Sequence, residues 1–231
     1  MEIHLLELLQ GYYLQLFIAG TAMTLRLFFA SLFSGFALAV LLTALRATGI
    51  PVLRWVIAAF VEYHRNVPAL VQIFVWYFGV SQLFPAAIRN WMNAQNGEFL
   101  FAYIALGLNV AAYMSEDLRS GLRSIARTQM EAARALGLNF TQAMRDVMLP
   151  QALRVASPPL VSQSLGLFKA TSLAMAIGVA ELTYSARLVD SDTFRTFEAF
   201  AIVSVIYLVG SWSIAGLGYL LESRLRRAGS Q

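Results

Sequence analysis

Long apolar runs alternate with shorter polar segments along this chain. A helix that crosses the hydrocarbon core of a membrane needs about 20 largely apolar residues, because each residue adds about 1.5 Å. The pattern therefore predicts an all-α, polytopic membrane protein with about five transmembrane helices in a single domain, residues 1–231. The predicted spans are residues 21–42, 67–84, 99–114, 155–182 and 197–221.

The polar segments between these runs predict the connections. Residues 1–18 mix leucine and tyrosine with glutamate, which predicts a short amphipathic helix in the membrane interface before the first span. Residues 85–98 are rich in asparagine and glutamine, which favours a loop. Paired prolines at 158–159 predict a bent or broken fourth span. A short acidic loop at 190–192 is expected before the fifth span.

Composition supports a membrane protein and excludes several other classes. The chain is 58% hydrophobic and 13% charged, with a mean hydropathy of +0.63. A net charge of +4 would suit nucleic acid only on a soluble fold with a basic face, so no nucleic-acid partner is expected. Cysteine is absent and His4 and His64 are isolated, so we expect no metal site and no cofactor. A membrane-embedded enzyme is disfavoured because no reactive constellation is present.

Basic residues are unevenly divided between the two predicted faces of the membrane. With the N-terminus outside, 12 of the 17 Lys and Arg residues lie on the cytoplasmic side and four outside. Cytoplasmic loops carry the excess of Lys and Arg, so the bias predicts a periplasmic N-terminus and a cytoplasmic C-terminus. The twelve are Arg46, Arg54, Arg65, the six arginines within residues 116–154 and the three of the C-terminal tail.

Residues 124–150 lie within the most charged part of the chain and cannot lie in hydrocarbon. Good helix formers from residue 124 end at Gly137, a residue suited to the left-handed position after a helix. Either Asn139 or Thr141 can cap a second short helix, which Pro150 is expected to close. The segment is therefore predicted to form a helix-turn-helix that protrudes into the cytoplasm.

Apolar side chains on this helix-turn-helix do not resemble spare lipid-facing surface. A helix that docks in the groove of a partner protein uses such side chains as anchors. The alternative is a solvated loop that only joins two spans. The side chains concerned are Met130, Ala133, Leu136, Leu138 and Phe140.

The same segment resembles a known family. Glu131-Ala132-Ala133, then Gly137 and the later Pro150, is similar to the EAA loop of ABC importer permeases. Other segments extend the resemblance over nearly the whole chain to the polar amino acid uptake family, including its glutamate/aspartate branch. These segments are residues 65–72, 112–122, 150–154 and 169–173.

This resemblance implies a subunit of a larger machine in the bacterial inner membrane. It implies pairing with a second, identical or homologous, permease, together with cytoplasmic ATP-binding subunits and a periplasmic binding protein. The EAA loop would be the coupling helix that docks in a cleft of the ATPase. The residues implied in coupling are Glu131, Ala132, Ala133, Gly137, Leu138, Phe140 and Pro150.

The chain lacks the G-x-x-x-x-G-K-[ST] loop that holds nucleotide phosphates. We therefore expect that it is not an enzyme and that a partner supplies ATP hydrolysis. An alternative is a secondary amino acid transporter driven by an ion gradient, which would need no ATPase.

Lys169 lies near the middle of the fourth predicted span. A charge at that depth costs several kcal/mol unless it is paired or faces water, so it marks a candidate substrate pathway. Thr171 and Ser172 can add hydroxyl groups beside it. The alternative is a structural lysine paired with Glu116 or Glu181.

Other polar residues complete the candidate pathway. Asn109 and Gln163 are equally plausible as hydrogen-bonding contacts between helices. The resembled family usually has an aspartate where this chain has Ala170, which leaves Lys169 freer to meet a substrate carboxylate. The substrate is expected to be a polar amino acid, acidic ones favoured, with glutamine or basic amino acids as alternatives. The pathway candidates are Lys169, Thr171, Ser172, Arg65, Gln72 and Glu116.

Overall fold

The computed structural model describes residues 5–94 and 96–227, and this part of the chain is almost entirely helical, with no strand. Within it, four helices are long and apolar enough to cross a membrane, and a shorter apolar helix adds a fifth segment. The predicted all-α, polytopic membrane fold is therefore confirmed. The four long helices are Gly11–Ala47, Gly97–Ser124, Phe140–Ile177 and Thr196–Arg224, and the shorter one is Ala69–Leu83.

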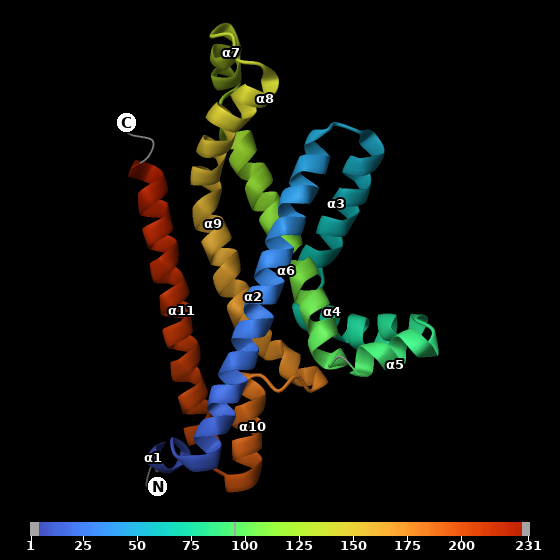
Figure 1. The fold of residues 1–231 in the computed structure, drawn as a ribbon, viewed down its shortest axis with the longest axis vertical. Coiled ribbons are helices and arrows are strands. Elements are labelled where there is room, and N and C mark those ends of the chain that lie inside the picture. The colour runs from blue at the N-terminus through green and yellow to red at the C-terminus, as the bar shows by residue number, and fades with distance from the viewer. Residues whose placement is uncertain (1–4, 95, 228–231) are drawn as a thin grey trace.

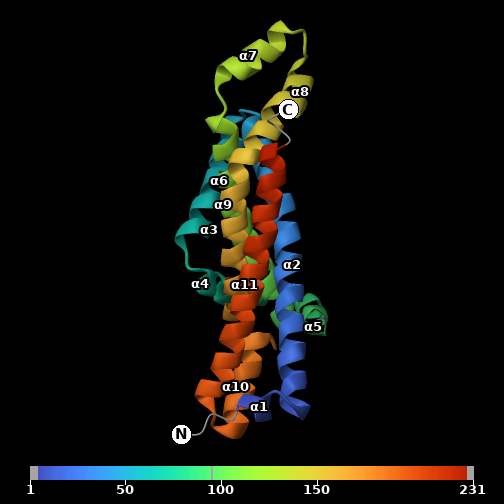
Figure 2. The same cartoon turned by 90° about the vertical axis from the view of Figure 1, so that its left-hand side faces the viewer.

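The long helices run side by side along the length of an elongated molecule (Figures 1 and 2). Short helices α7 and α8 protrude at one end, and α1 and α10 lie at the other (Figure 1). The long helices are α2 (Gly11–Ala47), α6 (Gly97–Ser124), α9 (Leu149–Ala170) and α11 (Thr196–Arg227). The short ones are α1 (Leu5–Leu8), α7 (Arg127–Ala135), α8 (Phe140–Ala143) and α10 (Leu182–Thr193).

The central contact of the bundle is between α2 and α6. A Cβ atom at Gly35 would lie 2.9 Å from the Gly107 carbonyl oxygen, so these two backbones approach too closely for a larger residue. Leu27 and Leu106 are fully buried in the surrounding core. This close packing fixes the position of α6, which contributes to both candidate sites described below.

The prediction of an interfacial helix over residues 1–18 is wrong for most of its length. Residues 1–4 lie outside the described part of the chain, and only Leu5–Leu8 forms a separate short helix. Helix α2 begins at Gly11 and runs without a break through the predicted span. Phe17 is buried against Leu182 and its neighbours, so tertiary packing lengthens the helix beyond the apolar run.

The second crossing differs from the predicted span 67–84. It begins earlier, with α3 (Pro51–Asn66), and continues after a break through α4 (Ala69–Phe74), a π-helical turn and a 3₁₀ turn that ends at Leu83. Val67 is extended because the following Pro68 disfavours helical geometry at the residue before it. This part of the chain therefore consists of two helical pieces, of which Ala69–Leu83 is the apolar one.

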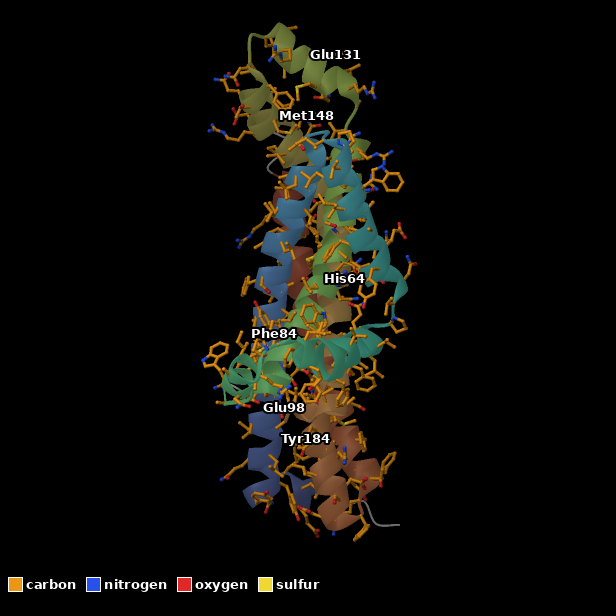
Figure 3. All side chains as sticks on the ribbon, turned by 90° about the vertical axis from the view of Figure 1, so that its right-hand side faces the viewer. His64, Phe84, Glu98, Glu131, Met148 and Tyr184 are labelled. Carbon is orange, nitrogen blue, oxygen red and sulfur yellow. The ribbon has the colours of Figure 1, made fainter. Side chains whose placement is uncertain are left out.

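Arg65 lies at the inner end of α3, next to His64, which stands near mid-height of the bundle (Figure 3). The sequence predicts that Arg65 lies on the cytoplasmic side. Arg65 is in the last turn of α3, and this end of α3 lies closer to the middle of the bundle than the end at which α2 joins α3 (Figure 1). Arg65 is thus brought close to the side chains of α6.

Two predicted loops are helical. Residues 86–94 form α5, which projects sideways from the bundle (Figure 1). The acidic segment at 190–192 belongs to α10, whose first turn is capped by the side chain of Glu181. The Glu181 carboxylate accepts hydrogen bonds from the backbone N–H groups of Thr183 and Tyr184, at 2.9 and 2.8 Å. The local sequence pattern around Glu181 does not predict that this residue is a buried helix cap.

Pro150 does not close the second helix of the helix-turn-helix. After α8, a π-helical turn at Met144–Met148 leads directly into α9, which contains Pro150 in its first turn. The continuous helical segment that contains the fourth predicted span thus starts at Phe140, well before residue 155. It loses α-helical geometry after Ala170, where a 3₁₀ segment runs to Ile177.

Candidate functional site

The turn of the helix-turn-helix is built around Gly137. Gly137 has φ +86°, and its N–H donates to the Arg134 carbonyl at 3.0 Å. The N–H of Leu138 reaches back to the Ala133 carbonyl at 3.2 Å. These two bonds form a Schellman motif, which satisfies the last carbonyls of α7 and reverses the chain.

Asn139 starts the second helix. Its side chain accepts a hydrogen bond from the Gln142 N–H at 2.9 Å, and the Gln142 side chain accepts one from the Asn139 N–H at 2.9 Å. This reciprocal pair is a capping box. Of the two caps that the sequence allowed, Asn139 is the one used.

The tip of the helix-turn-helix exposes large apolar side chains. Leu136 is 84% exposed and Phe140 60% exposed, whereas Ala133 is buried beneath them. Glu131 lies on the exposed surface of α7, near the outermost end of the molecule (Figure 3). Of the residues predicted to contact a partner, Ala133 therefore supports the turn from inside, while Leu136 and Phe140 form its surface.

A second feature is a pocket of about 220 Å³ between α6 and α9. Asn109 and Tyr113 line it from α6, and Gln163 and Gly166 line it from α9. Asn109 and Tyr113 are four residues apart, so they lie on one face of α6. Asn109 and Gln163, which the sequence suggests as hydrogen-bonding contacts between helices, thus line the same pocket between α6 and α9.

Asp117 lies one further turn along the same face of α6. Its Oδ2 atom is buried and has no hydrogen-bond partner among the described residues. Gln163 and Arg65 both lie close enough to this carboxylate to stabilise its charge. Sequence reasoning missed Asp117, although the spacing of 109, 113 and 117 could have revealed it.

Arg65 contacts the same group of residues. Its guanidinium carbon lies 5.4 Å from the centre of the Tyr113 ring, which is cation–π geometry. The Tyr113 hydroxyl donates a hydrogen bond to the Arg65 carbonyl at 3.0 Å. Arg65 is exposed and is not itself a lining residue, so it is connected to the pocket through Tyr113.

Lys169 is exposed on α9, between the lining residues Gly166 and Ala170, and forms no ion pair with any described residue. Within the described part of the chain Lys169 does not pair with Glu116 or Glu181, and the alternative of such a pair at the subunit interface stays a prediction. Glu116 is ion-paired with Arg46 and Arg119. Glu181 is fully buried and accepts a hydrogen bond from the Tyr207 hydroxyl at 2.9 Å.

The remaining pathway candidates occupy different environments. Thr171 is fully buried and donates to the Phe168 carbonyl at 2.7 Å, whereas Ser172 is half-buried and donates to the Lys169 carbonyl at 2.7 Å. Gln72 is also buried, away from the pocket lining, and donates to the His64 carbonyl at 2.9 Å. Gln72 therefore secures the break between α3 and α4.

A bundle of apolar spans with a protruding helix-turn-helix and a polar pocket between two of the spans defines a membrane transport subunit. The chain belongs to the family described as "Binding-protein-dependent transport system inner membrane component", whose sequence model matches residues 49–227. It is a membrane-spanning permease subunit of the ABC transporter class and is not itself the ATPase.

Individual relatives place it among amino-acid permeases. It is 42% identical to the probable amino-acid ABC transporter permease protein PatM of Vibrio harveyi, over 74% of each chain. It is 35% identical to the probable glutamine ABC transporter permease protein GlnM of Bacillus subtilis, over 86% of this chain and 88% of that protein. The chain is 34% identical to the glutamate/aspartate import permease protein GltJ of Escherichia coli, over 74% of this chain and 71% of that protein.

A solved structure has the same fold. It is described as a "Crystal structure of an amino acid ABC transporter with histidines" and superposes with a TM-score of 0.84 at 31% sequence identity. The match covers 97% of this chain and 100% of that chain. The architecture is thus that of an amino-acid ABC transporter permease along nearly its whole length.

Proposed function

We propose that this chain forms half of the membrane pore of an ATP-driven importer for polar amino acids, with acidic amino acids as the preferred substrates. The complete importer would contain a second, identical or homologous, permease, two cytoplasmic ATP-binding subunits and a periplasmic binding protein. The α7–α8 end would face the cytoplasm and the N-terminus the periplasm. The excess of arginine toward the α7–α8 end supports this orientation, even with Arg65 left out of the count.

The exposed tip of α7–α8 is the proposed contact with the ATPase. Leu136 and Phe140 expose apolar surface at the end of the molecule. Contact of such a surface with water is unfavourable, which supports a partner that covers it. The capping box and the Schellman motif hold the two short helices rigidly, so a push on the tip is transmitted into α6 and α9. Glu131 and Ala132 lie exposed on α7 and would line the same contact.

One observation carries the substrate proposal. The buried, unpartnered oxygen of Asp117 belongs to the face of α6 that lines the pocket, one turn beyond Tyr113, and an unpaired buried charge is costly. A substrate ammonium group would satisfy that oxygen. Lys169 and Arg65, both exposed beside the pocket, would meet substrate carboxylates.

The balance of charge supports an acidic substrate. Two cations and one anion surround the proposed site, and this arrangement complements the two carboxylates and one ammonium group of glutamate or aspartate. A glutamine permease and a glutamate/aspartate permease are related to this chain at nearly equal identity, so the argument for acidic substrates rests on these side chains.

Uptake by the reconstituted importer tests the proposal. The complex is placed in proteoliposomes with its binding protein outside and ATP inside, and entry of labelled glutamate is followed. We expect aspartate to compete and arginine not to compete. If unlabelled glutamate itself fails to compete with a transported amino acid, the acidic preference is wrong. Uptake by the purified chain alone, without ATPase subunits, would instead indicate a transporter driven by an ion gradient.

A further inference from the structure

A strongly basic cavity lies apart from both sites described above. It encloses about 650 Å³ between the last turns of α2, the first half of α3 and the last turns of α6. These segments meet at the end of the bundle from which α7 and α8 protrude (Figure 1). Four arginines line it, and they are Arg46, Arg54, Arg119 and Arg123.

The charge of this cavity is only partly balanced. Glu116 pairs with Arg46 and with Arg119, whose Nε lies 3.0 Å from a carboxylate oxygen. Arg54 and Arg123 form no ion pair with any residue in the described part of the chain. The cavity therefore carries an excess of about three positive charges if each guanidinium and the carboxylate are ionised. An anion is the ligand that such a cavity favours.

Arginine is suited to phosphate in particular. Its planar guanidinium offers parallel N–H donors that match two oxygens of a phosphate group, and it stays charged at every physiological pH. Arginines from three different helices surround a space large enough for a phosphate group and its substituents. Basic pockets between transmembrane helices on the cytoplasmic side are typical sites for anionic lipid headgroups.

The surface beside the cavity favours a lipid over a free phosphate. Trp55 lines the cavity from α3 and is 79% exposed, and Val52 and Val56 on the same helix are also exposed. Tryptophan is enriched where membrane headgroups meet acyl chains. A lipid would place its phosphate among the arginines and its chains along this apolar strip, whereas a free phosphate would leave the strip uncovered.

We propose that this cavity binds the headgroup of an anionic phospholipid. The choice of the cytoplasmic leaflet rests on the orientation proposed above, whereas the binding itself does not. The bound lipid would join α2, α3 and α6 at the end where α6 continues into the coupling helix-turn-helix. Anionic lipid would then strengthen the base from which the helix-turn-helix extends.

Lipid retention by the purified importer complex tests this site. The complex is reconstituted in nanodiscs containing equal amounts of phosphatidylglycerol and phosphatidylcholine, and bound lipid is measured by native mass spectrometry. We expect selective retention of phosphatidylglycerol. The double variant Arg54→Gln/Arg123→Gln should weaken its binding about 25-fold, since each arginine near the membrane surface contributes about fivefold. Arg46 and Arg119 are left intact because they hold Glu116.

A matched control removes two charges elsewhere. Arg187 and Arg224 are exposed, and neither lines the cavity, so Arg187→Gln/Arg224→Gln should retain the lipid as the unaltered chain does. Equal retention by both double variants would refute the site. Displacement of phosphatidylglycerol by inorganic phosphate at equal concentration would show that the cavity takes a free anion and would refute the lipid assignment.

A second measurement needs no arginine variant. Brominated phosphatidylglycerol should quench the tryptophan fluorescence of the complex more than brominated phosphatidylcholine does, and Trp55→Phe should abolish the difference. Equal quenching by the two lipids would contradict the proposal. Neither readout requires transport, so the proposed import function and this lipid site can fail independently.

Discussion

The helix-turn-helix and the polar pocket are built in opposite ways. The hydrogen bonds that form the turn and the cap of the helix-turn-helix join residues within 132–143, and most of them are backbone bonds. The pocket instead is lined by Asn109 and Tyr113 from α6 and Gln163 from α9, with Asp117 and Arg65 in contact with these residues. One site depends on local chain geometry, and the other depends on the register of packed helices.

This difference suggests how each site tolerates change. A single backbone change can destroy the helix-turn-helix, because its shape depends on one left-handed residue and two caps. The pocket is held by extensive packing, so a polar substitution should leave its shape intact and change only its chemistry. The predictions below test this contrast, from the largest expected effect to the smallest.

Replacement of Gly137 by proline should have the largest effect. Proline fixes φ near −65° and has no N–H, so it can neither adopt the φ of +86° nor donate to Arg134. The substitution should destabilise the turn by about 3 kcal/mol or more. ATP-driven uptake should then fall to below about one hundredth of the rate of the unaltered importer. Uptake and ATP hydrolysis by the reconstituted importer are measured together, and hydrolysis should continue without transport.

Gly137→Asn is the matched control, because asparagine tolerates the left-handed conformation better than other side chains do. A Cβ at this position would meet nothing within 4 Å, so the control adds no clash. It should retain most of the uptake. Unchanged uptake by Gly137→Pro would mean that this turn does not couple ATP hydrolysis to transport.

Replacement of Asp117 by asparagine should weaken the substrate site without unfolding it. The side chains are nearly the same size, but the neutral amide loses the charge proposed to hold the substrate ammonium. A hydrogen bond to a charged group contributes about 1.5–3 kcal/mol, so the apparent KM for uptake should rise at least about tenfold. Initial rates over a range of glutamate concentrations measure this change.

Asp192→Asn provides the same chemical change at an exposed residue of α10 and should leave KM unaltered. A fall in the maximum rate of Asp117→Asn with no change in KM would indicate that Asp117 acts on helix packing. The pocket would then not be the substrate site.

The same contrast explains how much could be predicted from sequence. The apolar runs revealed the fold class, and the spacing around Gly137 revealed the turn, because both signals are local. Asn139 and Thr141 could not be separated, since both side chains can cap a helix. The capping box with Gln142 resolved that choice.

Long-range packing decided what the sequence did not reveal. The sequence predicts a continuous span over 67–84 and no break at Pro68, and the way α3 packs on α6 places Arg65 beside Tyr113. Gln72 was assigned to the pathway as an intramembrane polar residue, yet its side chain satisfies backbone carbonyls freed by that break. Asp117 was passed over as one charge among many in a segment assigned to the cytoplasm.

Replacement of Phe140 by alanine should weaken the ATPase contact moderately. The side chain is 60% exposed, so its loss removes apolar contact surface with little effect on the fold. Interface aromatics commonly contribute about 1 kcal/mol or more, so the affinity for the ATPase subunits should fall at least about fivefold. Phe197→Ala is the control, because Phe197 is equally exposed near the start of α11, at the opposite end. Equal weakening by both variants would indicate a general loss of stability.

The smallest predicted effect separates the two candidate caps. Asn139→Ala removes the side-chain acceptor for the Gln142 N–H and should destabilise the start of α8 by about 1 kcal/mol. The Thr141 hydroxyl makes no hydrogen bond with any described residue, so Thr141→Ala should change little. Amide hydrogen exchange over residues 139–143 should then be about fivefold faster in the first variant alone. Equal exchange rates in the two variants would mean that packing of the buried Ala143 holds the turn, and that the caps contribute little to it.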